Sequence, residues 1–162
     1  MDGRKNLGFL GDVMNRFSFG GNFTYIEGEV DRFPIEIAVK NEAGRPVSGS
    51  RGLTEQPESI INFDLTYDDP DLGLRVSLVY YNISDVLESV SSQDSYDFYR
   101  KGYDQVDLTL SKNFGEHFKL SFSAKNITDS LRETFYDVEG SEREADVYRI
   151  GTSFSLSGSC RF

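Results

Sequence analysis

The 162-residue sequence is poor in the residues that build disulfide frameworks and metal sites. Its single cysteine, Cys160, excludes an internal disulfide and a cysteine-based zinc site. Its single histidine, His117, excludes a histidine-pair metalloprotease helix and a histidine-rich zinc or iron site. No Gly-x-Ser-x-Gly motif is present either. We therefore expect no enzymatic activity, no metal and no cofactor.

Long apolar runs and basic residues are also scarce. No stretch reaches the length of about 18 apolar residues that a transmembrane helix requires, although the half-apolar strands of a membrane barrel would escape such a scan. The sequence has 17 Lys and Arg against 27 Asp and Glu, a formal charge of -10, which argues against a nucleic-acid partner. The first residues lack the apolar segment of an export signal. The chain is thus either cytoplasmic or a piece of a longer exported protein.

Alternation of apolar and polar residues is the main pattern in the sequence. A period of two is typical of half-buried strands, and the length suits one domain over residues 1–162. The two short helical candidates, 84–91 and 130–135, fall between strands, and we expect neither to exceed one turn. The predicted strands are 17–25, 61–67, 74–81, 105–111, 118–125 and 148–156.

The connections between these strands alternate in length. Turn-forming residues at 69–72 and 113–116 predict tight antiparallel hairpins. The other three connections are far longer, so short turns lie at one edge of the sheet and long loops at the other. Outer-membrane barrels have this asymmetry, with short periplasmic turns and long extracellular loops. We therefore predict an all-β fold, an antiparallel up-and-down transmembrane β-barrel segment of about six strands within a larger barrel.

The two faces of such a sheet have different predicted environments. One residue of each strand illustrates the lipid-facing side: Phe23, Phe63, Leu78, Leu108, Leu120 and Phe154. Charged residues on the opposite side are expected to form a polar network in the lumen: Asp64, Arg75, Asp107, Lys119, Lys125 and Arg149. The alternative is a soluble β-sandwich or small-barrel ligand-binding module with the apolar face inside. An outer-membrane enzyme is a third alternative, but His117 lies at the short-turn edge, away from an outer active site.

Several segments resemble a known family. Residues 20–30, 53–67 and 79–82 resemble successive strands near the C-terminus of TonB-dependent outer-membrane receptors, and 104–112 resembles the strand after them. Residues 124–129 resemble the family's Lys-Asn-Leu-x-Asp element, and 148–151 its final strand. The terminal Phe162 resembles the C-terminal aromatic that outer-membrane barrels present to their assembly machinery. The resemblance extends over nearly the whole chain.

The resemblance implies a role in transport. A complete receptor of this family has about 22 strands and a plug domain that contacts TonB, and the chain lacks the plug. We therefore expect it to be the C-terminal part of a receptor barrel in the outer membrane of a Gram-negative-type bacterium. The receptor would import a scarce ligand such as a siderophore, cobalamin or a glycan. Its partners would be outer-membrane lipid, the remaining barrel and plug, TonB through that plug, and the assembly machinery.

Two of the long connections, 85–97 and 129–146, are rich in Asp and Glu. One hypothesis is that these carboxylates attract a cationic ligand, or a divalent metal that bridges to lipopolysaccharide. The simpler interpretation is that they keep ordinary loops solvated. The sequence leaves both open.

Overall fold

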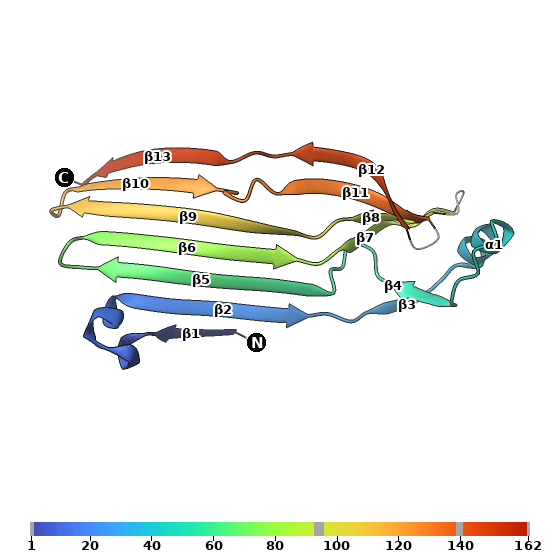
Figure 1. Ribbon diagram of the computed structural model, residues 1–162, viewed down its shortest axis with the longest axis horizontal. Helices are drawn as coiled ribbons and strands as arrows, with labels where there is room; N and C mark the ends of the chain where they lie inside the picture. Colours follow the sequence, from blue (N-terminus) through green and yellow to red (C-terminus); the bar gives the residue numbers. More distant parts are fainter. Residues whose placement is uncertain (1, 93–95, 139–140, 162) are drawn as a thin grey trace.

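A seven-stranded antiparallel sheet is the larger of the main sheets of the protein (Figure 1). The computed structural model describes residues 2–92, 96–138 and 141–161. Five of the six predicted strands are confirmed, the sixth, 148–156, is divided between two sheets, and β1 is added at one edge. In sheet order the strands are β1 (Asp2–Asn6), β2 (Phe17–Tyr25), β5 (Ser59–Asp69), β6 (Leu74–Ile83), β9 (Tyr103–Phe114), β10 (Phe118–Lys125) and β13 (Ser153–Cys160).

The strand register places the predicted apolar residues on one face. Phe63 lies opposite Tyr80, Leu78 opposite Leu108, and Phe154 opposite Ala124. Residues that face each other across an antiparallel pair point to the same side, so the alternation is continuous from β2 to β13. Among the described residues no second sheet covers this side, and the exposed fractions of its side chains reach 69% at Phe154 and 70% at Leu156.

Short connections join the strands at one edge, on the left in Figure 1. Gly73 and Gly115 close two of them with φ of +61° and +66°, a conformation that glycine adopts without a Cβ clash. The third, between β1 and β2, contains the 3-10 helices η1 (Gly8–Leu10) and η2 (Asp12–Arg16). The buried Asp69 carboxylate accepts hydrogen bonds from Arg16 Nη1 and Tyr67 Oη, which anchors η2 to the end of β5.

The long connections at the opposite edge are themselves ordered. The first contains β3 (Glu29–Asp31), α1 (Pro34–Glu42) and β4 (Ser50–Gly52). The other two form a four-stranded sheet in the order β12 (Ser141–Arg149), β11 (Leu131–Val138), β8 (Phe98–Arg100) and β7 (Val86–Ser89). The short helical candidates 84–91 and 130–135 contain the strands β7 and β11 instead, which satisfy their backbone groups by pairing with β8, so neither segment forms a helix of more than one turn.

The helix α1 begins at Pro34, whose fixed φ suits the first helical position, and ends before Gly44 at φ +75°. No helix in the described part of the chain has both the length and the apolar character needed to cross a membrane.

The last predicted strand is interrupted. β12 ends at Arg149 and β13 begins at Ser153, with Gly151 at φ +80° between them. The Gly151 carbonyl accepts a 3.0 Å hydrogen bond from Asn126 Nδ2, which holds the chain at this break. The expected position of Arg149 in the seven-stranded sheet is therefore wrong, although Phe154 keeps the predicted phase.

Candidate functional site

The polar face of the sheet contains ion pairs between nearby strands. Arg4 Nη2 lies 2.7 Å from Asp64 Oδ2, and the pair crosses over Gly20 of the intervening strand β2. A Cβ at Gly20 would clash with the Asp64 carboxylate, so the pair depends on glycine at this position. Arg75 lies directly opposite Asp68, with 3.7 Å between Nη1 and Oδ2.

The other predicted lumen residues do not join these pairs. Asp107 Oδ1 accepts hydrogen bonds from the Asn126 backbone and from the Gln105 side chain, both at 2.9 Å. Lys119 and Lys125 are exposed and form no ion pair with a described residue. Arg149 instead pairs with Asp129 beside the Gly151 break, at 2.5 Å. The polar face thus has separate local contacts rather than one network of the six predicted residues.

Two other residues considered from sequence are His117 and Phe162. His117 Nδ1 lies 3.1 Å from the Arg161 carbonyl oxygen, next to the β9–β10 turn. This position is at the edge opposite the long connections, as the sequence indicated. Phe162 lies outside the described residues, so its proposed role in assembly stays a prediction.

We call the end of the molecule that carries the long connections, opposite the short turns, the outer end. It holds a buried charge cluster that the sequence analysis did not single out. The cluster consists of Arg32, Glu36, Lys40, Arg51 and Asp97. Lys40 Nζ donates to Asp97 Oδ1 at 2.7 Å, and Arg51 Nε donates to Glu36 Oε2 at 3.0 Å. Because Asp97 belongs to the second long connection, the cluster ties α1 of the first connection to its neighbour.

The charges in this cluster nearly balance. Three cations face two carboxylates, and Glu36 and Lys40 are only 4% and 2% exposed. The hydrogen bond from Arg51 outweighs burial and holds the pKa of Glu36 below its ordinary value of 4.5. Isolated buried charges are costly, so these residues stabilise the contact only as a set. The sequence signal for it was weak: Glu36 and Lys40 are four residues apart, just after Pro34.

A recess of about 1060 Å³ lies beside the cluster. Its walls come from the paired strands β3 and β4, the residues that flank β2, β5 and β6, and one face of the four-stranded sheet. Leu87, Tyr99 and Phe135 lie opposite one another on that face, and the Tyr99 and Phe135 rings stack with centroids 5.5 Å apart. Five carboxylates also line the recess: Glu27, Glu29, Glu58, Asp85 and Glu142.

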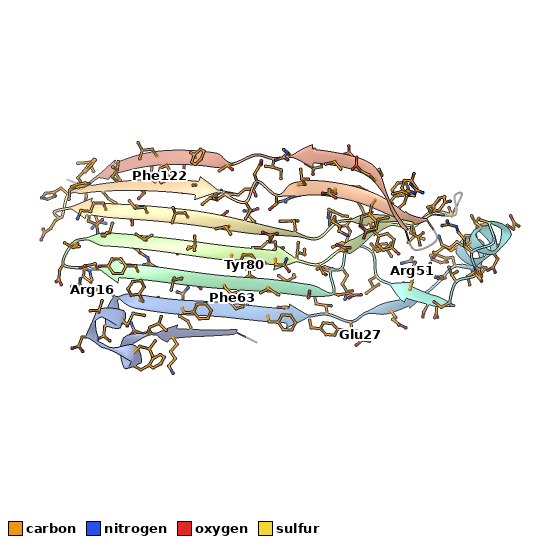
Figure 2. The ribbon with its side chains drawn as sticks, in the orientation of Figure 1. Arg16, Glu27, Arg51, Phe63, Tyr80 and Phe122 are labelled. Atoms are coloured by element: carbon orange, nitrogen blue, oxygen red, sulfur yellow. The ribbon has the colours of Figure 1, made fainter. Side chains whose placement is uncertain are left out.

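The recess therefore combines an aromatic floor with negative charge. Its two arginines, Arg32 and Arg51, are engaged by Glu36 and Asp97 of the charge cluster. Figure 2 shows Glu27 beyond the end of β2, and Arg51 on β4, at the outer end of the molecule. The connections 26–58, 84–102 and 126–152 together carry 18 acidic and nine basic side chains, against nine and eight in the rest of the chain. Most of the negative charge thus lies at this end.

Only some of the acidic residues noted from sequence in 85–97 and 129–146 take part in the recess or the charge cluster. Asp85 and Glu142 line the recess, and Asp97 is drawn into the charge cluster. Asp94 and Glu139 lie outside the described residues. In the described part of the chain, no three or more His, Cys, Asp and Glu side chains gather as a metal site would require.

The architecture defines a class of protein. One exposed apolar face, short turns at one edge and elaborate connections at the other identify a section of transmembrane β-barrel wall. The family model "TonB dependent receptor-like, beta-barrel" matches residues 2–127, and the chain belongs to this family. Its members are receptors and transporters of the Gram-negative outer membrane, not enzymes. Neither the curated proteins nor the solved structures contain a match to the chain.

Proposed function

We propose that residues 1–162 form the C-terminal part of the barrel of a TonB-dependent receptor that imports a scarce ligand of the siderophore, cobalamin or glycan class. The chain contributes barrel wall and outer loops to this receptor. Family membership implies contact with outer-membrane lipid and with the rest of a receptor. The specific partners are part of the proposal: the plug domain, TonB acting through that plug, and the assembly machinery that recognises Phe162.

The continuous apolar face is the observation that carries the proposal. Phe23, Phe63 and Leu78 are 42% to 48% exposed, and no second sheet of the described residues covers them. Leu108 and Leu120 are half-buried only by their neighbours on the same face. Hydrocarbon is the environment that makes such a face favourable, because leaving each of these half-exposed side chains in water would cost about 1 kcal/mol.

Aromatic rings at the short-turn edge fit the same orientation. Phe114 and Phe118 lie 5.7 Å apart across the β9–β10 hairpin, and Phe17 and Tyr67 lie 5.0 Å apart across β2 and β5. Rings at this level match the interfacial girdle of a membrane barrel, between headgroups and acyl chains. The long connections with the recess would then face the exterior, and the polar face would line the lumen. The two edge strands, β1 and β13, would pair with further barrel strands.

Spin labels on opposite faces of one strand test this orientation. Thr109 and Leu110 are adjacent, exposed residues of β9 that point to opposite sides. Each is replaced by cysteine in a Cys160→Ser background, and the full chain is labelled in lipid vesicles. We expect the label at 110 to be more accessible to oxygen, which partitions into lipid, and the label at 109 to a water-soluble nickel complex.

Leu78→Cys and Ser77→Cys on β6 provide a second matched pair with the same alternation. Equal access of the nickel complex to all four labels would contradict the membrane orientation. It would favour a water-exposed sheet or a soluble binding module.

A further inference from the structure

Two carboxylates and an aromatic ring of the recess lining already hold an ammonium group of the chain, that of Lys101, although Lys101 itself is not part of the lining. Lys101 Nζ lies 2.6 Å from Glu142 Oε1, 3.5 Å from Asp85 Oδ2 and 4.9 Å from the centroid of the Phe135 ring. Glu142, Asp85 and Phe135 all line the recess. An ammonium held by carboxylates over an aromatic face is the arrangement in which proteins bind organic amines.

Lys101 compensates only part of the negative charge. Glu27, Glu29 and Glu58 are exposed on the other side of the recess, and none forms an ion pair with a described residue. The lining arginines offset this charge only in part, because Arg32 and Arg51 already face Glu36 and Asp97. The volume of about 1060 Å³ is at the upper end of the range for small-molecule sites. The recess is thus large, aromatic at its floor and short of positive charge.

We propose that this recess binds an organic polyamine, a ligand with two or more ammonium groups on an apolar chain. The methylene segments would pack on Leu87, Tyr99 and Phe135, and the ammonium groups would meet the carboxylates of the rim. An inorganic cation would leave the apolar floor unused, and an anionic ligand would meet the uncompensated glutamates. This inference deepens the proposed function, since it names a ligand class for the outer loops and rests on that function for its biological role.

The charge cluster and the pairing between β8 and β11 hold the three long connections together. The α1 segment is tied to the second connection by Lys40 and Asp97, and the second is paired with the third through β8 and β11. The carboxylates of three connections are thereby brought around one space. Their mutual repulsion is a cost that a polycation would relieve.

Spermidine, a linear triamine, is the probe for this proposal. Its affinity for the full chain in detergent micelles is measured by isothermal titration calorimetry at about 0.15 M salt, where long-range attraction is screened. Replacing Glu27, Glu29 and Glu58 together by glutamine should weaken binding by about ten-fold. The matched control changes Glu42→Gln, Glu116→Gln and Asp146→Asn, which are exposed carboxylates outside the recess. It should weaken binding by less than about two-fold.

Lys101 gives an independent test of opposite sign. Lys101→Met vacates the carboxylates at Asp85 and Glu142, so spermidine should bind about three-fold more tightly. Arg143→Met removes the same charge from β12 without opening the recess, and should change the affinity little. These residues are at least partly exposed, so the substitutions are not expected to disturb the fold.

Three results would overturn the proposal: no measurable spermidine binding, equal weakening by the recess and control variants, or equal tightening by Lys101→Met and Arg143→Met. Displacement of spermidine by Mg²⁺ at the same concentration of charge would also overturn it, since the site would then recognise charge alone. None of these results bears on the label accessibilities of Thr109 and Leu110. Failure of the ligand class is therefore distinguishable from failure of the receptor proposal.

Discussion

Lys40 Nζ donates a 2.7 Å hydrogen bond to Asp97 Oδ1, although the two residues are 57 positions apart. Lys40 is 2% exposed, and its charge is compensated within the protein rather than by water. Arg32 Nη1 lies 3.7 Å from the other oxygen of Asp97. The Asp97 carboxylate thus contacts two cations of the first long connection and links α1 to the second one.

Removal of the Asp97 carboxylate should release α1. In Asp97→Ala the buried ammonium of Lys40 loses its 2.7 Å hydrogen bond to Asp97, which destabilises the docked state by about 3 kcal/mol. Hydrogen exchange of the α1 amides, followed by mass spectrometry, should become correspondingly faster, while exchange in β5 and β6 stays unchanged. Asp31→Ala serves as the control, because it removes an exposed carboxylate from the first long connection, which contains α1. Equal protection of α1 in both variants would contradict the role of Asp97.

Acid should release α1 through Glu36. The Arg51 hydrogen bond lowers the pKa of Glu36, so its contribution to docking is fully present above the ordinary value of 4.5 and is lost as the pH falls through the lowered one. A spin label at Ile35→Cys, an exposed site on α1, should therefore keep its restricted mobility at neutral pH and gain mobility only below about pH 4.5.

The same titration on Glu36→Gln provides the control. The amide has no charge to lose, so the Glu36-dependent part of the transition should disappear and α1 should be less firmly docked at neutral pH. The remaining charged groups that face Glu36 are Arg32, Arg51 and, through Arg32, Asp97. An identical pH profile in the two proteins would assign the transition to Asp97 or to another group.

The central strands could be predicted from sequence because a half-buried strand imposes a period of two on its residues. β5 and β6 show this directly, with Phe63 and Leu78 on one side and Asp64 and Ser77 on the other. β1 could not be predicted in this way, because its segment Asp2–Asn6 has no apolar alternation. It is a strand through its backbone pairing with β2.

The helix α1 and the charge cluster were beyond the sequence pattern. Ile35, Ile37 and Val39 alternate with a period of two, which favours a strand, and Ile35 ends up exposed while Glu36 is buried. The helix is instead stabilised by ion pairs with Arg51 and Asp97, which lie far along the chain. The period of a sequence pattern predicts which face of a strand or helix a residue lies on. It does not predict the ion-pair partners that are distant in the sequence and meet only in the folded chain.

Asn126 should be essential for the junction between the two sheets. The residue has φ of +56°, and its side chain bonds the Gly151 carbonyl and accepts from the Ser130 amide. Asn126→Ala loses these bonds and places alanine in the left-handed region, at a combined cost of about 3 kcal/mol. Asn126→Gly retains the backbone freedom and should recover about 1 kcal/mol of that loss. Exchange protection of β11 and β12 measures both effects, and equal protection in the wild type and Asn126→Ala would contradict them.

Substitution of Gly20 tests whether the Arg4–Asp64 ion pair stabilises the protein, without removing either charge. A Cβ at this position would displace the Asp64 carboxylate that pairs with Arg4, so Gly20→Ala should destabilise the chain by about 1–2 kcal/mol in urea unfolding from micelles. Gly3→Ala is a matched control in the adjacent strand, because a Cβ there meets no atom within 4 Å. That variant should change stability by less than about 0.5 kcal/mol. If both variants unfold at the same urea concentration, the Arg4–Asp64 pair does not depend on the glycine between its strands.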